Sequence, residues 1–149
     1  MICIIQCIII QYIRHIWFVS LKHYKIKKFT NEAKKVDLLD ESLLDTISDF
    51  LSLGKEGQQK YSLGAGLYKL RLATKEGRGK SGGSRSILAF KKDYRVIWIH
   101  LFSKNDKGNI TTSELKKLKS LSDILLTLSD DEISRLIDLG ELYEVIENV

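Results

Sequence analysis

The residues that decide the fold run from position 67 to position 103 and read LYKLRLATKEGRGKSGGSRSILAFKKDYRVIWIHLFS. In the first part, Tyr68, Leu70 and Leu72 alternate with Lys69 and Arg71, which is the period of a β-strand with one buried face. Apolar strand-like segments follow at 84–90 and 94–103, after a glycine-rich turn at 77–83 and a short polar turn at 91–93. The stretch therefore predicts three adjacent antiparallel strands.

Helices are predicted on both sides of these strands. Residues 24–29 alternate as a short strand would, residues 30–36 predict one or two helical turns, and residues 40–53 carry the apolar stripe of a helix. Downstream, TTSE at 111–114 and SDDE at 129–132 are capping boxes that open two more helices. Residues 142–146 predict a strand or a packed tail. The fold class is α+β.

Charge is distributed unevenly along the 149 residues, although the net charge is only +5. From Lys60 to Lys107 there are 12 Lys and Arg against 3 Asp and Glu, whereas from Ile110 to Val149 there are 4 against 9. A basic middle favours a polyanionic partner, with nucleic acid first among the candidates. The alternative interpretation is a charged, solvated surface with halves that neutralise each other.

The first 23 residues form an apolar N-terminal extension ahead of a domain predicted at 24–149. A membrane-spanning helix needs ~20 apolar residues, and here Gln6, Gln11, Arg14 and His15 interrupt the run. A secretory signal carries its cations before the apolar segment, whereas these come within and after it. Three interpretations stay open: a start codon assigned too far upstream, a membrane anchor, or an additional packed element.

Cysteine and histidine usage argues against several classes of site. Cys3 and Cys7 are the only cysteines, so neither a disulfide framework nor a cysteine-based zinc site is expected. The three histidines are too scattered for a metal cluster, and we predict no metal. This usage fits a cytoplasmic protein.

The segment GKS at 79–81 suggests a nucleotide-binding P-loop, but the pattern fails. A P-loop requires a glycine five residues before the GKS glycine and a helix after it. Position 74 holds Thr74, and the residues after Ser81 predict a strand. The glycines therefore serve a different purpose.

A phosphodiester is the alternative ligand for the cations around this turn. They are Lys69 and Arg71 on the first strand, Arg78 and Lys80 in the loop, Arg85 on the second strand and Lys104 after the third. If the strands pair in register, several of these side chains share one face, and arginine binds phosphate oxygens in a bidentate manner. The plainer interpretation is a set of exposed cations on an uncovered sheet face.

These segments resemble toxins of the RelE/HigB type, which belong to toxin–antitoxin systems. The resemblance rests on LYKLRLA, GRGKSGGSRSILAF and IHLFSKND in this order with helices before and after, and it covers about Tyr24 to Thr127. It implies a small twisted antiparallel sheet of about four strands, two N-terminal helices packed on one face, and C-terminal helices. It also implies a ribosome-dependent mRNA endoribonuclease, inhibited by a cognate antitoxin that is commonly of the helix-turn-helix type.

The resemblance assigns a role to each cation. Lys69, Arg71, Arg85 and Lys104 correspond to the catalytic positions, and Arg78 and Lys80 to loop cations that hold RNA. Because RNA supplies its own 2′-hydroxyl nucleophile, we expect no metal and no other cofactor. Arginine suits stabilisation of the phosphorane, so we assign Arg71 and Arg85 to the phosphate. Proton transfer is assigned to Lys69 or Lys104.

Some features depart from the family pattern. Such enzymes often carry a late Arg, Tyr or His, for which Tyr143 is a weak candidate. His100 shares strand parity with Trp98 and Phe102 and therefore either faces the open side or packs among aromatics. Two alternative functions are a ParE-like toxin that inhibits DNA gyrase without cleavage, and an inactive RNA-binding relative. A membrane partner is expected only if residues 1–21 are an anchor.

Overall fold

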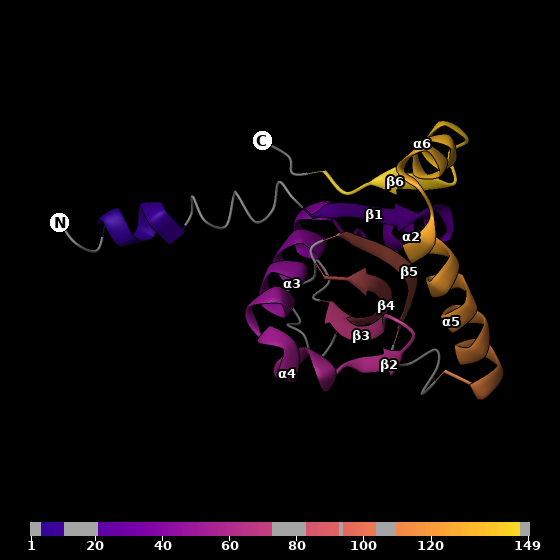
Figure 1. Cartoon of the computed structure of the whole chain (residues 1–149), viewed down its shortest axis with the longest axis horizontal. Coiled ribbons are helices and arrows are strands. Elements are labelled where there is room, and N and C mark those ends of the chain that lie inside the picture. Colours follow the sequence, from indigo (N-terminus) through magenta and orange to yellow (C-terminus); the bar gives the residue numbers. More distant parts are fainter. Residues whose placement is uncertain (1–3, 11–20, 73–82, 93, 104–109, 147–149) are drawn as a thin grey trace.

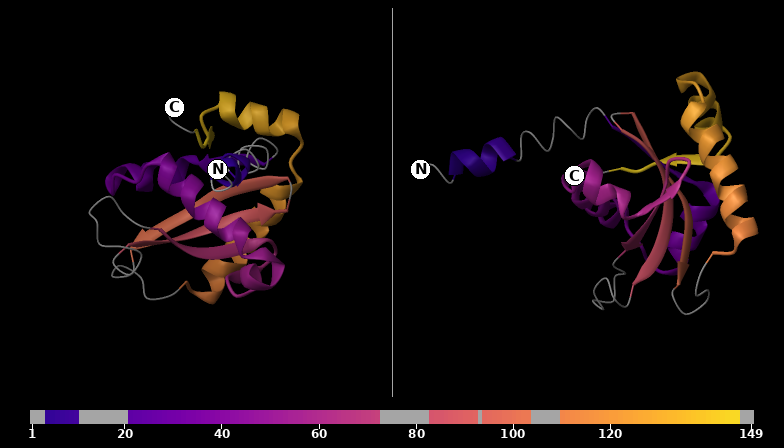
Figure 2. Two further views of the ribbon diagram at one scale, coloured as in Figure 1. Left: turned by 90° about the vertical axis from the view of Figure 1, so that its left-hand side faces the viewer. Right: turned by 60° about the horizontal axis from the view of Figure 1, so that its bottom comes forward.

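The computed structural model describes residues 4–10, 21–72, 83–92, 94–103 and 110–146. From residue 21 onward, a six-stranded sheet separates two groups of helices, with α3 on one side and α5 and α6 on the other (Figures 1 and 2). The strands are β1 (Lys22–Ile26), β2 (Ser62–Gly64), β3 (Leu67–Leu72), β4 (Ser84–Lys91), β5 (Arg95–Ser103) and β6 (Leu142–Glu144). The helices are α2 (Lys27–Lys35), α3 (Asp40–Ser52), α4 (Gly54–Gln59), α5 (Thr112–Thr127) and α6 (Asp130–Asp138). The predicted α+β class is confirmed.

The sheet differs from the prediction in size and in direction. Its strand order is β2-β3-β4-β5-β1-β6, so the expected number of about four strands is wrong. The β3-β4-β5 meander is antiparallel as predicted. However, β1 pairs with β5 in parallel, which makes the sheet mixed. Alternation in a sequence indicates a strand but carries no information about its direction, so this pairing could not be predicted.

The N-terminal strand is also shorter than predicted. It ends at Ile26, and Lys27 already belongs to α2. Phe29 and Ala33 are both buried, four residues apart on one helix face, so the apolar residue at the end of the expected strand serves the helix instead.

Two apolar clusters hold the layers together. On one face, Phe29 of α2 and Ile47 and Phe50 of α3 pack against the sheet, which confirms the two N-terminal helices on a single face. On the other face, Leu125 of α5 and Ile133 of α6 pack against the sheet. The apolar stripe of α3 recurs at three- and four-residue intervals and explains its burial.

A half-buried histidine packs beside Trp98 of the first cluster. The indole Nε1 of Trp98 donates a hydrogen bond to Nε2 of His23, and the two rings stack with centroids 6.1 Å apart. Burial lowers the pKa of His23 to about 3, since a charged imidazolium is poorly solvated there. His23 is therefore neutral at physiological pH.

The tip of the β2–β3 hairpin is fixed against α5. Ala65 and Gly66 form the turn with φ angles of 53° and 75°, which suit a tight hairpin connection. The Ser122 hydroxyl donates a hydrogen bond of 2.7 Å to the Ala65 carbonyl. A Cβ on Gly66 would lie 2.7 Å from Cδ1 of Leu126. This close packing sets the position of β2 beside β3.

A buried arginine holds the C-terminal end of α5. Arg95 is fully buried, and its Nη1 donates to the carbonyls of Leu125 and Leu128 at 2.8 and 2.9 Å. Its Nη2 donates to the Tyr94 hydroxyl at 2.9 Å and approaches Asp130 at 3.5 Å. The guanidinium thereby satisfies carbonyl groups that a helix leaves unpaired at its end.

Both predicted capping boxes are present. Thr111 and Glu114 exchange side-chain and backbone hydrogen bonds at the start of α5, and Ser129 and Glu132 do so at the start of α6. Among the described residues, no helix is long and apolar enough to cross a membrane. Residues 4–10 form a short helical segment with exposed side chains that lies outside the sheet and its helices (Figure 1).

Candidate functional site

Two arginines lie directly opposite each other on neighbouring strands. Arg71 on β3 pairs with Arg85 on β4, so both side chains project from the same face, with Cβ atoms about 5 Å apart. Lys69 lies two residues before Arg71 and therefore projects from this face as well. The structure thus brings together three of the cations that the sequence singled out, while their roles remain predictions.

The charges at this position are of one sign. Like charges directly opposite each other on a sheet oppose folding. Within the part of the chain that the structure describes, no carboxylate forms an ion pair with Lys69, Arg71 or Arg85. Lys69 Nζ lies 5.9 Å from the centre of the Phe102 ring, near the limit of a cation–π contact. Concentrated positive charge of this kind favours an anionic ligand.

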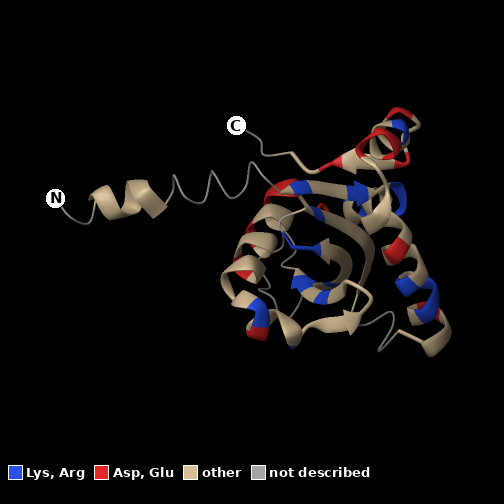
Figure 3. Ribbon diagram, in the orientation of Figure 1, with Lys and Arg blue, Asp and Glu red and all other residues tan. Residues whose placement is uncertain are grey.

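The basic and acidic parts of the chain are separated in space. Basic positions lie on β3 and β4 within the sheet, whereas acidic positions gather on α6 and β6 (Figure 3). Asp130 of α6 and Glu141, the residue before β6, pair with cations on β1 and α2: Lys22 contacts Asp130 at 2.8 Å, and Lys27 contacts Glu141 at 3.9 Å. The acidic C-terminal elements are therefore neutralised in part by the N-terminal elements and not by the arginine pair.

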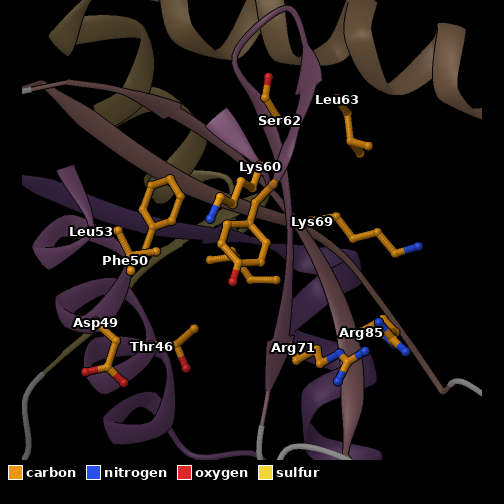
Figure 4. A pocket seen from close by; sticks show the side chains of 12 residues that line it. Thr46, Asp49, Phe50, Leu53, Lys60, Ser62, Leu63, Lys69, Arg71 and Arg85 are labelled. Atoms are coloured by element: carbon orange, nitrogen blue, oxygen red, sulfur yellow. The ribbon is translucent and has the colours of Figure 1, made fainter. Parts of the chain in front are cut away.

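The three cations line one end of a hollow with a volume of about 640 Å³. Its lining comes from α3, from the segment before and within β2, and from β3 and β4: Thr46, Asp49, Phe50, Leu53, Lys60, Tyr61, Ser62, Leu63, Lys69, Leu70, Arg71 and Arg85. Figure 4 shows Arg71 and Arg85 close together on neighbouring strands, with Thr46 and Asp49 of α3 on the other side of β3. Four of these residues are cationic and one is acidic, so the hollow is positively charged.

Three predicted site residues cannot be placed in this arrangement. Lys104 and the loop cations Arg78 and Lys80 lie outside the described residues. Ser103 is the last described residue of β5 and pairs with Ser84, the neighbour of Arg85. The roles of the three cations remain predictions.

His100 lies on the same sheet face as the arginine pair, but it does not share this face with Trp98, as its position in the strand predicted. His100 lies opposite Ile87, and a bulge between Ile87 and Leu88 then shifts the register so that Leu88 lies opposite Trp98. His100 consequently stacks on Phe102, with ring centroids 5.2 Å apart. Trp98 packs in the cluster on the other face of the sheet, so the predicted shared parity of His100 and Trp98 is wrong. A bulge places two consecutive residues against one partner and reverses the alternation beyond it.

A carboxylate of α2 lies beside His100. Glu32 Oε2 is 3.8 Å from His100 Nδ1 and accepts a hydrogen bond of 3.1 Å from the backbone N–H of Leu101. Glu32 thereby covers the part of β5 that extends beyond its pairing with β1. Tyr143, the other late candidate, lies on β6, at the opposite edge of the sheet from β2 and β3, where it pairs with Lys25 of β1. Tyr143 therefore does not join the cations.

Sequence reasoning did not find the part of the hollow beyond the cations. Lys60 and Tyr61 precede β2 in a segment without alternation, and Asp49 lies off the apolar stripe of α3. The backbone N–H of Lys69 donates to the Tyr61 carbonyl at 2.9 Å, which places the backbone of Tyr61 beside that of Lys69. The glycine-flanked turn at 64–66 was the available signal, because a tight turn there implies that the preceding residues pair with β3.

Comparison with known families gives a match over most of the chain. The sequence model described as the RelE toxin of the RelE/RelB toxin–antitoxin system matches residues 21–145. The matched range begins just before β1 and ends just after β6, so it includes every strand of the sheet. No curated protein matches the chain significantly.

Proposed function

The chain belongs to the family of RelE toxins of toxin–antitoxin systems, and from this premise we propose that it is a ribosome-dependent endoribonuclease that cuts mRNA. The observation that carries the proposal is the arginine pair. Arg71 and Arg85 are opposed on neighbouring strands and, in the described part of the chain, have no acidic partner. Such an arrangement is costly for folding and useful for holding a phosphodiester.

The proposed chemistry transfers a phosphoryl group within the RNA. The 2′-oxygen attacks the adjacent phosphorus, the new O2′–P bond forms, and the P–O5′ bond breaks. The proton leaves the 2′-hydroxyl for a base, and another proton reaches the departing 5′-oxygen. The products are a 2′,3′-cyclic phosphate and a 5′-hydroxyl. Charge accumulates on the non-bridging oxygens in the transition state, where fixed positive groups lower the barrier most.

Each of the predicted residues has a task in this scheme. Arg71 and Arg85 hold the non-bridging oxygens, and their forked guanidinium groups fix the orientation of the phosphate. Lys69 projects from the same face of the sheet and transfers a proton, with Lys104 as the other candidate. Arg78 and Lys80, which lie outside the described residues, are assigned to holding the RNA. The reaction needs no cofactor, because the substrate carries its own nucleophile.

The proposal includes partners and a place of action. A cognate antitoxin, of the helix-turn-helix type, neutralises the toxin. The mRNA and the ribosome are the targets, and the protein acts in the cytoplasm where translation occurs. Positive charge in the hollow supports the nucleic-acid part of this scheme, since phosphate contacts dominate such binding.

Expression in bacteria tests the proposal. Cells that produce the full chain are expected to stop growing and to accumulate new mRNA 5′ ends confined to translated frames. Arg85→Ala should abolish both effects. Arg135→Ala is the matched control, because Arg135 is an exposed arginine on α6 outside the hollow. Arrest without mRNA cuts would instead indicate a gyrase-type toxin, and RNA binding without arrest would indicate an inactive relative.

A further inference from the structure

The proposed phosphoryl transfer needs two groups that move protons, one at the 2′-oxygen and one at the 5′-oxygen. Lys69 supplies one of them, and His100 lies on the same face of the sheet. The two residues belong to one row across three strands, since Lys69 lies opposite Ile87 and Ile87 lies opposite His100. Lys69 and His100 therefore flank β4, and their backbones are roughly 10 Å apart, which is two strand spacings.

Arg85 lies in the adjoining row, next to His100. Arg85 pairs with Phe102 of β5, so His100, two residues before Phe102, is the diagonal neighbour of Arg85. Diagonal neighbours on a sheet lie about 7–8 Å apart, a separation that long side chains bridge. The centre of the Phe102 ring is 5.2 Å from the centre of the His100 ring and 5.9 Å from Lys69 Nζ. The imidazole is therefore within reach of a phosphate that Arg85 holds.

A carboxylate of α2 orients the imidazole. Glu32 Oε2 lies 3.8 Å from His100 Nδ1, so Nε2 of the same ring is directed away from the carboxylate. Glu32 Oε2 also accepts a hydrogen bond of 3.1 Å from the Leu101 N–H, which fixes the carboxylate against β5. Lys28, one turn earlier on α2, lies 4.0 Å from Glu32. The side chains of His100 and Glu32 are 19% and 24% exposed, so the imidazole exchanges protons with solvent.

The charges around His100 suit a group that donates a proton. Glu32 on α2 stabilises a protonated imidazole, whereas Lys69 on β3 and Arg85 on β4 oppose it. A bound phosphodiester carries a negative charge and offsets part of this opposition. The imidazolium is then the form present beside the substrate, and removal of the 2′-hydroxyl proton is left to Lys69.

We propose that His100 is the general acid of the cleavage and that Glu32 is its positioning residue. The inference rests on the proposed nuclease function and adds a catalytic residue to it. As the 2′-oxygen attacks phosphorus, the P–O5′ bond breaks, and its electron pair stays on O5′. This oxygen takes the proton of His100 Nε2, and the neutral imidazole regains a proton from solvent.

A substrate with sulfur at the leaving position tests the general acid. The wild-type cut site is mapped on programmed ribosomes, and the bridging 5′-oxygen at that site is then replaced by sulfur. A thiolate leaves without a proton, because thiols are far stronger acids than alcohols. His100→Gln should cut natural mRNA about 10²-fold more slowly than wild type and should cut the sulfur substrate nearly as fast as wild type. Equal losses on both substrates, including those caused by misfolding, would overturn the proposal.

The pH dependence of cleavage tests the positioning residue. Histidine ordinarily changes charge between pH 5 and 8, so loss of the acid proton should bend the wild-type rate profile downward in this range. His100→Gln should lack the bend. Glu32→Gln keeps an oxygen that accepts from the Leu101 N–H but removes the negative charge, so the bend should move to lower pH. Glu144→Gln, which removes an exposed carboxylate of β6, is the matched control. An unmoved bend in Glu32→Gln would overturn the positioning role.

The outcomes separate the general acid from the nuclease function. Wild-type protein that cuts no mRNA on ribosomes would overturn both. Wild-type cleavage with an unchanged rate in His100→Gln, or a bend that persists in this variant, would overturn the general acid alone. The second proton transfer would then return to Lys104, the other predicted candidate.

Discussion

Replacing Arg85 by alanine should separate activity from stability. The side chain lies directly opposite Arg71, and no described carboxylate forms an ion pair with either. Two unit charges about 5 Å apart repel each other by about 0.8 kcal/mol at the dielectric constant of water. Because Arg71 is exposed and Arg85 only half-buried, solvent and salt keep the repulsion near this size. Removing this repulsion offsets the packing energy that is lost with the aliphatic stem of Arg85.

The free energy of unfolding and the cleavage rate should therefore respond differently to this substitution. The free energy of unfolding of Arg85→Ala should lie within about 1 kcal/mol of the wild-type value. The cleavage rate should fall about 10²- to 10³-fold, as expected when one fixed group that stabilises transition-state charge is removed. Arg85→Lys should give an intermediate rate, because a lysine keeps the charge but not the bidentate geometry.

Urea unfolding and ribosome-dependent cleavage measure these quantities on the same samples. Arg135→Ala, which removes an exposed arginine elsewhere, should leave both unchanged. A loss of several kcal/mol in Arg85→Ala, with a parallel loss of folded protein, would mean that the arginine serves the fold. A stable Arg85→Ala protein that cuts at the wild-type rate would refute the reasoning.

Three further predictions concern the scaffold. Burial lowers the pKa of His23 to about 3. The free energy of unfolding should therefore be highest above about pH 6.5 and should fall toward pH 3, by up to roughly 4–5 kcal/mol. Urea unfolding measured against pH should give a flatter profile for His23→Gln. Gly66→Ala should destabilise by about 2–4 kcal/mol, because its φ is 75° and its Cβ would lie 2.7 Å from Leu126. Gly54→Ala, at φ 69° with nothing within 4 Å, should cost only about 1–2 kcal/mol. Arg95→Ala should lower the free energy of unfolding by about 3–5 kcal/mol, measured by thermal or urea unfolding, and an unchanged value would contradict its role at the end of α5.

Local patterns predicted the central strands and the helix starts well. Alternation around Lys69 and Arg71 identified β3, and the short connections predicted the antiparallel meander. Both capping boxes appear where the sequence placed them. These features depend on neighbouring residues, whose periodicity and side-chain chemistry are visible in the sequence.

Features that depend on distant segments were not predictable. The parallel pairing of β1 with β5 joins residues more than 70 positions apart. The bulge that moves His100 away from Trp98 leaves no mark in the alternation of an apolar strand. Tyr61 and Asp49 line the same hollow as the cations only because β2 and α3 lie beside β3. Sequence reasoning therefore found the cationic end of the candidate site and missed the rest of the hollow.

Cleavage on purified ribosomes is the most direct test of the nuclease proposal. End-labelled mRNA should be incubated with the purified full chain, with and without programmed ribosomes, in parallel with Arg85→Ala and Arg135→Ala. The proposal predicts cleavage only on ribosomes, fragments that end in a 2′,3′-cyclic phosphate, and loss of cleavage in Arg85→Ala alone. Intact mRNA on ribosomes with folded wild-type protein, or equal cleavage by Arg85→Ala, would contradict it.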